Sequence, residues 1–360
     1  MPHVLKAGIL GATGTVGQRF ILLLSQYPGF SIHALGASPR SAGKTYAKAT
    51  KWKMSQPIPK PVQSMIVHTC EPTGAFLECD VVFSGLDADV AGDIEMAFLK
   101  ADLGIFSNAK NYRTHDDVPL IVPLTNPEHF DLLAHQRSKH QLKKGFLVTN
   151  ANCSTSGLVV PLKALQDAFG PLSRVIVTTM QAVSGAGYPG VSSLDIFDNV
   201  VPYIGGEEPK MEWETLKILG GLNQDQTAFE FLKGTKVSAT CNRVPVLDGH
   251  TECVSVEFER RPAPSPEEVI AVLENYRSEA QELGCSSAPE QAIIVSREDD
   301  RPQPRLDRDN GNGYSVTVGR VRPCNVFDIK FTLLVHNTIL GAAGSGVLLA
   351  ELAQKKGLLP

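Results

Sequence analysis

The amino-terminal sequence places the strongest constraint on the fold. Residues 4–10 form an apolar run typical of a buried strand, and the turn that follows, GATGTVG at residues 11–17, has a glycine at every third position. Apolar residues then recur at helical spacing as far as residue 24, and residues 31–37 form a second apolar strand pattern. This order predicts a β-α-β unit, and therefore an α/β fold that begins with a parallel sheet.

The glycine-rich turn favours a nucleotide site. Glycines permit a tight turn and let a pyrophosphate approach the backbone, and the amino end of the following helix then binds the phosphates. The spacing is GxxGxxG rather than GxGxxG, so the turn alone is a modest signal, and a simple tight connection is the alternative. The strand before the turn and the helix after it favour the nucleotide interpretation.

The end of the second strand pattern favours NADP over NAD. NAD sites usually have an Asp or Glu here, which binds the ribose hydroxyls. Residues 37–44 contain no acid, but they include two serines, Ser38 and Ser41, and two cations, Arg40 and Lys44. Arg40 is a candidate donor to the extra 2′-phosphate of NADP. A solvated polar turn is the alternative, for Lys44 especially.

A polar motif surrounds Cys153. An apolar strand pattern at residues 145–148 precedes the sequence TNANCSTSG at residues 149–157, and a helical stripe follows it. Because Asn, Ser and Thr are common helix caps, Cys153 is predicted at the amino end of a helix. There the helix dipole favours a thiolate, and free backbone N–H groups can stabilise an oxyanion. A buried, inert cysteine is the alternative, but the cap-rich setting favours a nucleophile at Cys153.

Composition argues against several other classes of protein. The chain has 360 residues, enough for two domains, and a formal net charge of −4, far from the basic character of a nucleic-acid-binding protein. Its longest apolar runs are much shorter than the ~20 residues of a transmembrane helix, and no signal peptide is visible. Seven cysteines without a CxxC pair argue against a disulfide framework or a structural zinc site. We therefore expect a cytoplasmic protein that needs no metal.

Several residues are candidate partners for Cys153. A thiolate nucleophile needs an acid or base nearby. Among nine histidines, His250 is preferred because it lies on a glycine-containing loop, seven positions after Arg243. Arginine forks suit carboxylates, and Arg113 and Lys210 are candidates for a phosphate. An NADP fold combined with a thiolate suggests an aldehyde or acyl redox step through a thioester.

Other segments carry structural expectations. Residues 266–283 and 339–355 are each predicted as a helix, and residues 297–312, which mix charges, prolines and glycine, as a mobile loop. His33 and His336 are interpreted as structural. Five further histidines are expected at the surface: His3, His115, His129, His135 and His140.

Ordered motifs are spread over nearly the whole chain. They comprise residues 11–17, 150–154 (NANCS), 181–189, 205–211 (GGEEPKM), 241–250 (CNRVPVLDGH), and the pair Asn337-Thr338 ahead of the terminal helix. Together their order and spacing are highly specific, and they resemble those of the aspartate-β-semialdehyde dehydrogenase family, in the branch typical of fungi and archaea.

The resemblance implies an α/β protein of two domains. Residues 1–152 would form a Rossmann-like NADP-binding domain, completed by a carboxyl-terminal helix at residues 338–360. Residues 153–337 would form an α+β catalytic and dimerisation domain with a large mixed sheet. The protein would assemble as a homodimer or a homotetramer.

The resemblance also implies roles for individual residues. Cys153 would be the nucleophile, His250 the general acid/base and Gln181 a residue that orients the substrate. Arg243 would bind the α-carboxylate and Glu207 the amino group; Glu207 is preferred to its neighbour Glu208 because it keeps an ExxK spacing to Lys210. Phosphate or the acyl phosphate would contact Arg113, Lys210 and Asn111. The NADP site would be lined by Gly11, Thr13, Gly14, Thr15, Val16, Ser38, Arg40, Ser41, Ser184, Gly185 and Asn337.

The implied reaction is the NADPH-dependent conversion of aspartyl-4-phosphate to aspartate semialdehyde and phosphate, in the biosynthesis of lysine, threonine and methionine. A malonyl-CoA reductase and an N-acetylglutamyl-phosphate reductase, which share the thioester logic, are the alternative enzymes. A non-catalytic NADP-binding sensor is the alternative of a different class.

Overall fold

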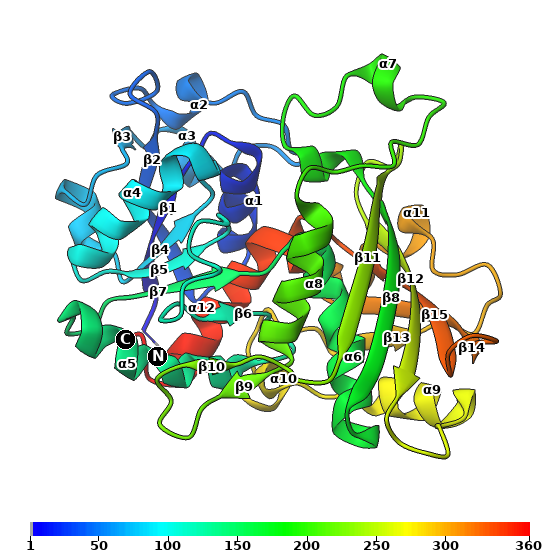
Figure 1. The fold of residues 1–360 in the computed structure, drawn as a ribbon. Helices are drawn as coiled ribbons and strands as arrows, with labels where there is room; N and C mark the ends of the chain where they lie inside the picture. The colour runs from blue at the N-terminus through cyan, green and yellow to red at the C-terminus, as the bar shows by residue number, and fades with distance from the viewer. Residues whose placement is uncertain (1–2) are drawn as a thin grey trace.

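The computed structural model describes residues 3–360, and Figure 1 shows two sheets that lie side by side. The first sheet has seven strands in the order β3-β2-β1-β4-β5-β7-β6, and every pairing in it is parallel. Its strands are β1 (Leu5–Leu10), β2 (Phe30–Ala37), β3 (Val67–Thr69), β4 (Val81–Ser84), β5 (Gly104–Ser107), β6 (Leu120–Ile121) and β7 (Phe146–Asn150).

The second sheet has six strands of mixed direction, in the order β11-β8-β12-β15-β14-β13. β11 runs parallel to β8, whereas β12 is antiparallel to both β8 and β15. Its strands are β8 (Leu172–Gln181), β11 (Lys236–Arg243), β12 (His250–Phe258), β13 (Ile293–Val295), β14 (Val316–Pro323) and β15 (Ile329–Val335); β9 (Gly221–Leu222) and β10 (Phe229–Glu230) pair separately.

Helices cover the first sheet and one face of the second (Figure 1). The longer ones are α1 (Thr15–Leu24), α4 (Ala88–Lys100), α5 (Leu133–His140), α6 (Cys153–Phe169), α8 (Glu207–Ile218), α9 (Pro266–Asn275) and α12 (Gly344–Lys355). The short ones are α2 (Tyr46–Ala49), α3 (Lys60–Gln63), α7 (Ser193–Ile196), α10 (Glu279–Glu282), α11 (Pro304–Asp307), and the turns η1 (Gly74–Glu78), η2 (Pro127–Leu132), η3 (Val183–Ala186), η4 (Asn310–Gly313) and η5 (Ile339–Ala343).

Two helices connect the halves of the molecule. α6 leaves the first sheet directly after β7 and packs against β8, β12 and β15 of the second sheet. Its first thirteen residues are almost entirely buried. The chain then returns, since α12 packs against α1 and β5, and Figure 1 shows this red helix beside the blue and cyan elements of the first half. The carboxyl-terminal helix therefore completes the packing around the first sheet.

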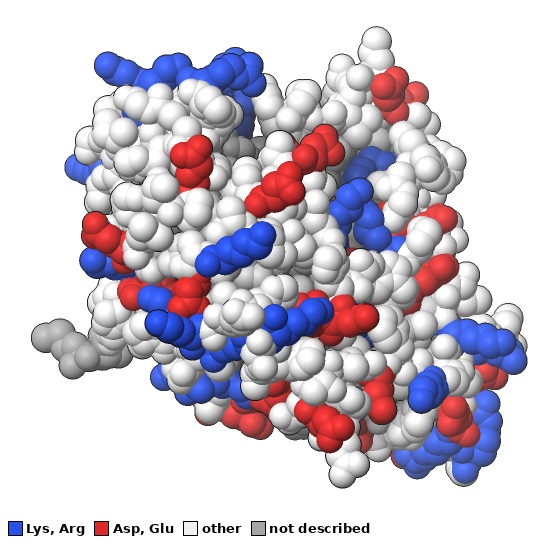
Figure 2. Space-filling model, turned by 60° about the vertical axis from the view of Figure 1, so that its left-hand side comes forward, with Lys and Arg blue, Asp and Glu red and all other residues white. Residues whose placement is uncertain are grey.

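The predicted β-α-β unit is confirmed. β1, α1 and β2 begin and end within one residue of the expected limits, and β1 pairs with β2 in parallel. Within residues 3–360, no helix has both the length and the hydropathy that crossing a bilayer requires. On the face shown in Figure 2, acidic and basic side chains are mixed over the middle and lower parts, and a group of basic side chains lies along the upper left edge.

Two predicted helices are interrupted. The prediction of one helix over residues 266–283 is wrong, because the chain leaves α9 at Tyr276, whose backbone is extended and whose hydroxyl donates to Leu124 O. A new capping box at Ser278 then starts α10. The helix expected from residue 339 begins regularly only at Gly344, since Ala342 has non-helical angles.

Two other expectations are also corrected. Residues 297–312 contain α11 and η4, and an ion pair joins Arg301 to the buried Asp307, so the segment is folded rather than an open loop. His129 is fully buried in η2 instead of exposed, and its Nδ1 lies 3.0 Å from Asn126 Nδ2. Burial lowers the pKa of His129 to about 4.

Candidate active site

A cavity of about 1650 Å³ extends from the glycine-rich turn after β1 to Cys153 at the start of α6. Both halves of the molecule contribute to its walls, which suits a dinucleotide at one end and a small substrate at the other. Nine of the residues predicted for the cofactor line it, namely Gly11, Thr13, Gly14, Thr15, Val16, Ser38, Ser184, Gly185 and Asn337. Arg40 and Ser41 belong to the turn after β2 but do not line the cavity.

The glycine-rich turn fits a pyrophosphate. Gly11 has a φ of +72°, and a Cβ built on Gly17 would lie 2.3 Å from Gly11 O, so neither position accepts a side chain without strain. Gly14 caps α1 without any side-chain hydrogen bond, and Thr15 and Val16 of the first helical turn face the cavity. The N–H of Gly14 donates to Gly11 O, which leaves the N–H groups of Thr15 and Val16 at the start of the helix for an anion.

Cys153 is the first residue of α6, as predicted. Asn152 caps the helix, since its Oδ1 accepts from the backbone N of Ser154 and of Thr155 at 2.9 and 3.1 Å. The Cys153 Sγ lies 3.2 Å from His250 Nε2. His250 was expected on a loop, but it is the first residue of β12 and is fully buried. The sheet therefore fixes the position of the imidazole relative to the thiol.

A backbone contact determines the tautomer of His250. The N–H of Ala182 donates to His250 Nδ1 at 3.0 Å, so Nδ1 is an acceptor and the proton of the neutral ring sits on Nε2. Nε2–H therefore points at the sulfur. Burial, and then the charges of Arg243 and His336, lower the pKa of His250 well below its ordinary value.

The expectation of an easily ionised thiol is wrong for the protein without ligands. Burial raises the pKa of Cys153 to about 12, and the charge of Glu207 adds to this effect. Arg243, Arg113 and the backbone N–H of Ser154 act in the opposite direction but do not outweigh burial. These pKa directions favour a neutral thiol beside a neutral imidazole, because the nearby positive charges offset only part of the loss of hydration.

The register of the second sheet brings three predicted residues to one end. Arg243 at the end of β11 pairs with Gln181 at the end of parallel β8, and His250 begins the antiparallel strand on the other side of β8. Arg243 Nη1 donates to Ala182 O at 2.7 Å. A Cβ built on Gly185 would lie 2.9 Å from Arg243 Nη1 and 3.2 Å from the His250 ring, so only glycine lets this loop pack over both.

Glu207, and not Glu208, faces the cavity. Its Oε1 accepts from Asn152 Nδ2 at 2.6 Å and its Oε2 contacts Lys210 Nζ at 3.0 Å. Burial raises the pKa of Glu207, but Lys210, Asn152 and Gln181 outweigh burial and hold it below its ordinary value. Glu208 instead accepts from the backbone N of Cys241 on β11. These positions agree with the preference for Glu207 over Glu208 drawn from the ExxK spacing, and the contact with substrate stays a prediction.

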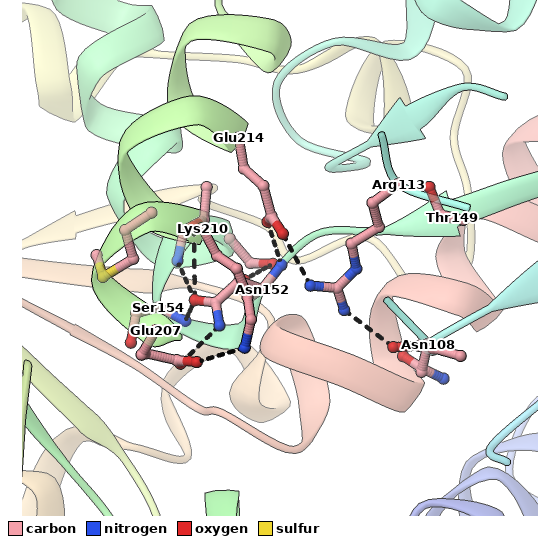
Figure 3. A network of polar contacts seen from close by, with 12 residues as sticks. Asn108, Arg113, Thr149, Asn152, Ser154, Glu207, Lys210 and Glu214 are labelled. Atoms are coloured by element: carbon pink, nitrogen blue, oxygen red, sulfur yellow. Dashed lines mark hydrogen bonds and ion pairs between the residues drawn. The ribbon is translucent and has the colours of Figure 1, made fainter. Parts of the chain in front are cut away.

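Arg113 lies on the loop after β5, at the cavity wall, and is 7% exposed. Its Nη1 donates to Glu214 at 2.9 Å and its Nη2 donates to Asn108 O at 2.9 Å. Its Nε is buried and has no partner. Figure 3 shows this guanidinium between Glu214 of α8 and Asn108.

Asn111 does not join the other predicted residues. Its Nδ2 donates to Ala88 O at the start of α4, and its side chain packs against Gly92 of the same helix. Asn108 and Lys110, from the same loop, do line the cavity and were missed. Asn108 directly follows a strand end, a position at which ligands commonly bind in parallel sheets, and this signal could have identified it.

Comparisons with known proteins agree with this geometry. Residues 6–133 match the model of the semialdehyde dehydrogenase NAD binding domain, and residues 162–340 match that of the semialdehyde dehydrogenase dimerisation domain. The chain is 61% identical over 356 residues to the aspartate-semialdehyde dehydrogenase of Schizosaccharomyces pombe, which covers 98% of this chain and 99% of that protein. An archaeal relative from Archaeoglobus fulgidus is 47% identical over 98% of the chain and 99% of its own length.

Solved structures show the same relationship. The crystal structure of aspartate semialdehyde dehydrogenase with NADP from Candida albicans superimposes with a TM-score of 0.92, at 56% identity over 99% of both chains. Aspartate semialdehyde dehydrogenase II complexed with ASA from Vibrio cholerae has a TM-score of 0.74 and 28% identity over 97% of this chain and 98% of that chain. The chain belongs to the aspartate-semialdehyde dehydrogenase family.

Proposed function

We propose that this enzyme reduces L-aspartyl-4-phosphate to L-aspartate 4-semialdehyde with NADPH, releases phosphate, and catalyses the reverse, phosphate-dependent oxidation. The observation that carries the proposal is the 3.2 Å contact between Cys153 Sγ and His250 Nε2, at one end of a cavity whose other end is the glycine-rich turn. The reaction belongs to the biosynthesis of lysine, threonine and methionine. The cofactor and the ligand named for the Candida and Vibrio structures support it.

The amino-acid part of the substrate contacts Arg243 and Glu207. The Arg243 fork suits the α-carboxylate, and the ionised Glu207 carboxylate suits the α-ammonium group. Gln181 lies beside both and orients the acyl carbon toward Cys153. This pairing of a buried acid with a buried arginine favours an amino acid over malonyl-CoA, which has no ammonium group for Glu207 to bind.

The phosphate group contacts Arg113 and Lys210. Both line the cavity, and the Arg113 Nε, which is buried without a partner, is the donor that a phosphate oxygen would satisfy. The role suggested for Asn111 receives no support from its contacts with α4.

The first half-reaction forms a thioester. Cys153 Sγ attacks the acyl carbon, a C–S bond forms, the C–O bond to phosphate breaks, and the thiol proton leaves with the phosphate. Since His250 Nδ1 already accepts a backbone N–H, Nε2 serves as a donor to the sulfur and to the oxygen of the tetrahedral intermediate. In this tautomer His250 acts as a hydrogen-bond donor through Nε2, and the general acid/base role expected for it stays a prediction.

The second half-reaction reduces the thioester. NADPH bound along the glycine-rich wall supplies the hydride. The resulting oxyanion collapses, the C–S bond breaks, and His250 Nε2–H stabilises the departing sulfur, which regains a proton from solvent. Gly185 packs against the His250 ring and the Arg243 guanidinium, and Ser184 lines the cavity beside it.

NADP is the proposed cofactor. Ser38 lines the cavity at the end of β2, where an NAD site would have an acid, and Arg40 is exposed on the same turn. The contacts of α12 with α1 and β5 support the proposed division into residues 1–152 with 338–360, and 153–337. Residues 1 and 2 lie outside the described part of the chain. The seven cysteines are all free, which supports the proposed reducing, cytoplasmic location.

A substrate panel tests the proposal. We expect aspartate semialdehyde to be oxidised with NADP⁺ only when phosphate is present, and activity to disappear in Cys153→Ser. Malonyl-CoA with NADPH, and N-acetylglutamate semialdehyde with phosphate and NADP⁺, should be turned over at least about a hundredfold more slowly. Preferred turnover of either compound would overturn the substrate assignment, and binding of NADP without any turnover would indicate a sensor.

A further inference from the structure

Four of the six charged residues of α8 form a stripe. Glu207, Lys210, Glu214 and Lys217 are spaced by three or four residues and so lie on one helix face. This face meets both the capped start of α6 and the loop that carries Arg113 (Figure 3). Glu207 and Lys210 have roles in the proposed function, but Glu214 has none so far.

Glu214 has two donors, one on each carboxylate oxygen. Its Oε1 accepts from Arg113 Nη1 at 2.9 Å, and its Oε2 accepts from the backbone N of Asn152 at 2.6 Å. Its side chain is 0% exposed. Figure 3 shows the carboxylate between the two donors, with Arg113 on one side and Asn152 on the other. No other side chain in the network contacts both residues.

We propose that Glu214 is a positioning residue that holds the phosphate-binding Arg113 and the nucleophile-bearing turn at Asn152 in one fixed relation. The proposal rests on the proposed function, because it takes Arg113 as a phosphate ligand and Cys153 as the nucleophile. Glu214 itself does not line the cavity and acts only through these two neighbours.

The arginine side of the link fixes the direction of the free donor. Glu214 and Asn108 O together hold Nη1 and Nη2, so the plane of the guanidinium is set from two directions. The Nε donor, which has no partner in the protein, is then free to bind a phosphate oxygen. Without Glu214, Arg113 would also lose the negative charge that offsets the cost of burying its own charge.

The other side of the link fixes the start of α6. Asn152 precedes Cys153 directly, and its backbone N–H is held by Glu214 while its Nδ2 is held by Glu207. With both groups held, the Oδ1 cap on Ser154 and Thr155 keeps one orientation. The distance from the sulfur to His250 depends on this turn, so Glu214 also acts on the reactivity of Cys153.

Only glutamate satisfies both donors. Glutamine has one acceptor oxygen, and its NH₂ group would face either the Asn152 N–H or the Arg113 guanidinium as a second donor. Aspartate keeps the charge, but it is one methylene shorter and cannot keep both contacts from the same helix position. Both substitutions therefore weaken the contacts with Arg113 and Asn152 while a polar side chain still fills the space of Glu214.

The test compares Glu214→Gln with Glu212→Gln. Glu212 lies on the same helix and accepts from a backbone N–H, that of Ala239, but it touches neither Arg113 nor Asn152. We expect Glu214→Gln to raise KM for phosphate roughly ten- to hundredfold and to lower kcat, as the loss of a charge-assisted hydrogen bond predicts. Glu212→Gln should leave both KM for phosphate and kcat unchanged. The Kd for NADP should be unchanged in both variants.

A double-variant cycle distinguishes positioning from a general structural effect. In an Arg113→Met background, Glu214→Gln should raise KM for phosphate no further, whereas its effect on kcat through Asn152 should persist. An equal rise of KM in both backgrounds would contradict the proposal, and so would a Glu214→Gln enzyme that behaves like wild type. Should Glu214→Gln fail to fold, Glu214→Asp decides the question by the same readouts.

A measurement that needs no turnover separates the positioning role of Glu214 from the proposed function. Inorganic phosphate should slow the alkylation of Cys153 by iodoacetamide in wild type and in Glu212→Gln, and roughly tenfold more phosphate should be needed in Glu214→Gln. If wild type oxidised the aldehyde without phosphate, the proposed function would fail. If phosphate dependence held but Glu214→Gln needed no more phosphate than wild type, only the positioning role would fail.

Discussion

At the scale of single residues, the thiol of Cys153 is subject to opposing effects. The helix start and two arginines favour a thiolate, but burial and Glu207 favour the thiol more strongly and raise the pKa of Cys153 to about 12. The sequence predicted the position at the helix start correctly, because cap residues are local signals. It did not predict the protonation state, because burial depends on parts of the chain that are far away in sequence.

The raised pKa predicts how Cys153 reacts in the absence of ligands. Below a pKa of about 12, the thiolate fraction, and with it the alkylation rate, should rise about tenfold per pH unit between pH 7 and pH 9. The rate of iodoacetamide labelling at Cys153, with Cys153→Ser subtracted for the other cysteines, measures this. A rate that is already independent of pH above pH 7 would show that the helix start and the arginines prevail.

The adjacent acids Glu207 and Glu208 provide a matched pair. Glu207→Gln removes the charge expected to bind the substrate ammonium, so KM for aspartate semialdehyde should rise about tenfold or more. Glu208→Gln weakens only a contact with the backbone of β11, so KM should stay within about twofold of wild type. Steady-state kinetics at saturating NADP⁺ and phosphate test both, and a larger effect of Glu208→Gln would reverse the assignment.

The residues that the sequence missed differ in how they could have been found. Asn108 lines the cavity itself and follows a strand end, whereas Glu214 becomes part of the site only through its contacts, one of them with Arg113, 101 positions away. No local pattern identifies Glu214, which looks like an ordinary helix residue. His129 was misplaced for the same reason, since its burial depends on how η2 packs in three dimensions.

At the scale of elements, patterns that repeat within one segment were predicted and interruptions were not. β1, α1 and β2 follow from apolar periodicity and glycine spacing. The break at Tyr276 depends on a hydrogen bond to Leu124, more than a hundred residues away. The irregular turn at Ala342 likewise arises where its carbonyl accepts from Asn150 and where Gly341 packs against Cys153.

The glycine-rich turn yields a prediction for the element it begins. In Gly17→Ala, the new Cβ would lie 2.3 Å from Gly11 O, a backbone atom that cannot rotate away, so α1 must shift. We expect NADP to bind about tenfold or more weakly, as measured by fluorescence titration. Gly29→Ala is the control, since nothing lies within 4 Å of its Cβ position. Unchanged NADP affinity in Gly17→Ala would mean that this turn does not hold the cofactor.

At the scale of the whole molecule, the second sheet has one face covered by helices and one face open. α6 and α8 pack against the covered face, whereas Ile176 of β8 is 47% exposed on the other. The match to a dimerisation domain over residues 162–340 covers this sheet. We therefore propose that the open face meets a second copy of the chain, in a homodimer or in a tetramer built from such dimers.

Substitution of Ile176 tests the dimer. A carboxylate at the centre of an apolar contact must lose its hydration, so Ile176→Asp should weaken self-association about thirtyfold or more. Sedimentation velocity over a range of protein concentrations measures the change. Leu77→Asp, at a side chain that is 54% exposed in the first half of the chain, is the control and should leave the assembly intact. A wild-type monomer, or an Ile176→Asp dimer of unchanged affinity, would contradict the proposed interface.

The central claim is that Cys153 carries a thioester that phosphate cleaves. The most direct measurement mixes the enzyme with aspartate semialdehyde and NADP⁺ without phosphate, and follows NADPH at 340 nm together with the mass of the peptide that contains Cys153. We predict a burst of about one NADPH per active site, an acyl group on Cys153, and steady turnover once phosphate is added. Steady turnover without phosphate, or a burst in Cys153→Ser, would contradict the account.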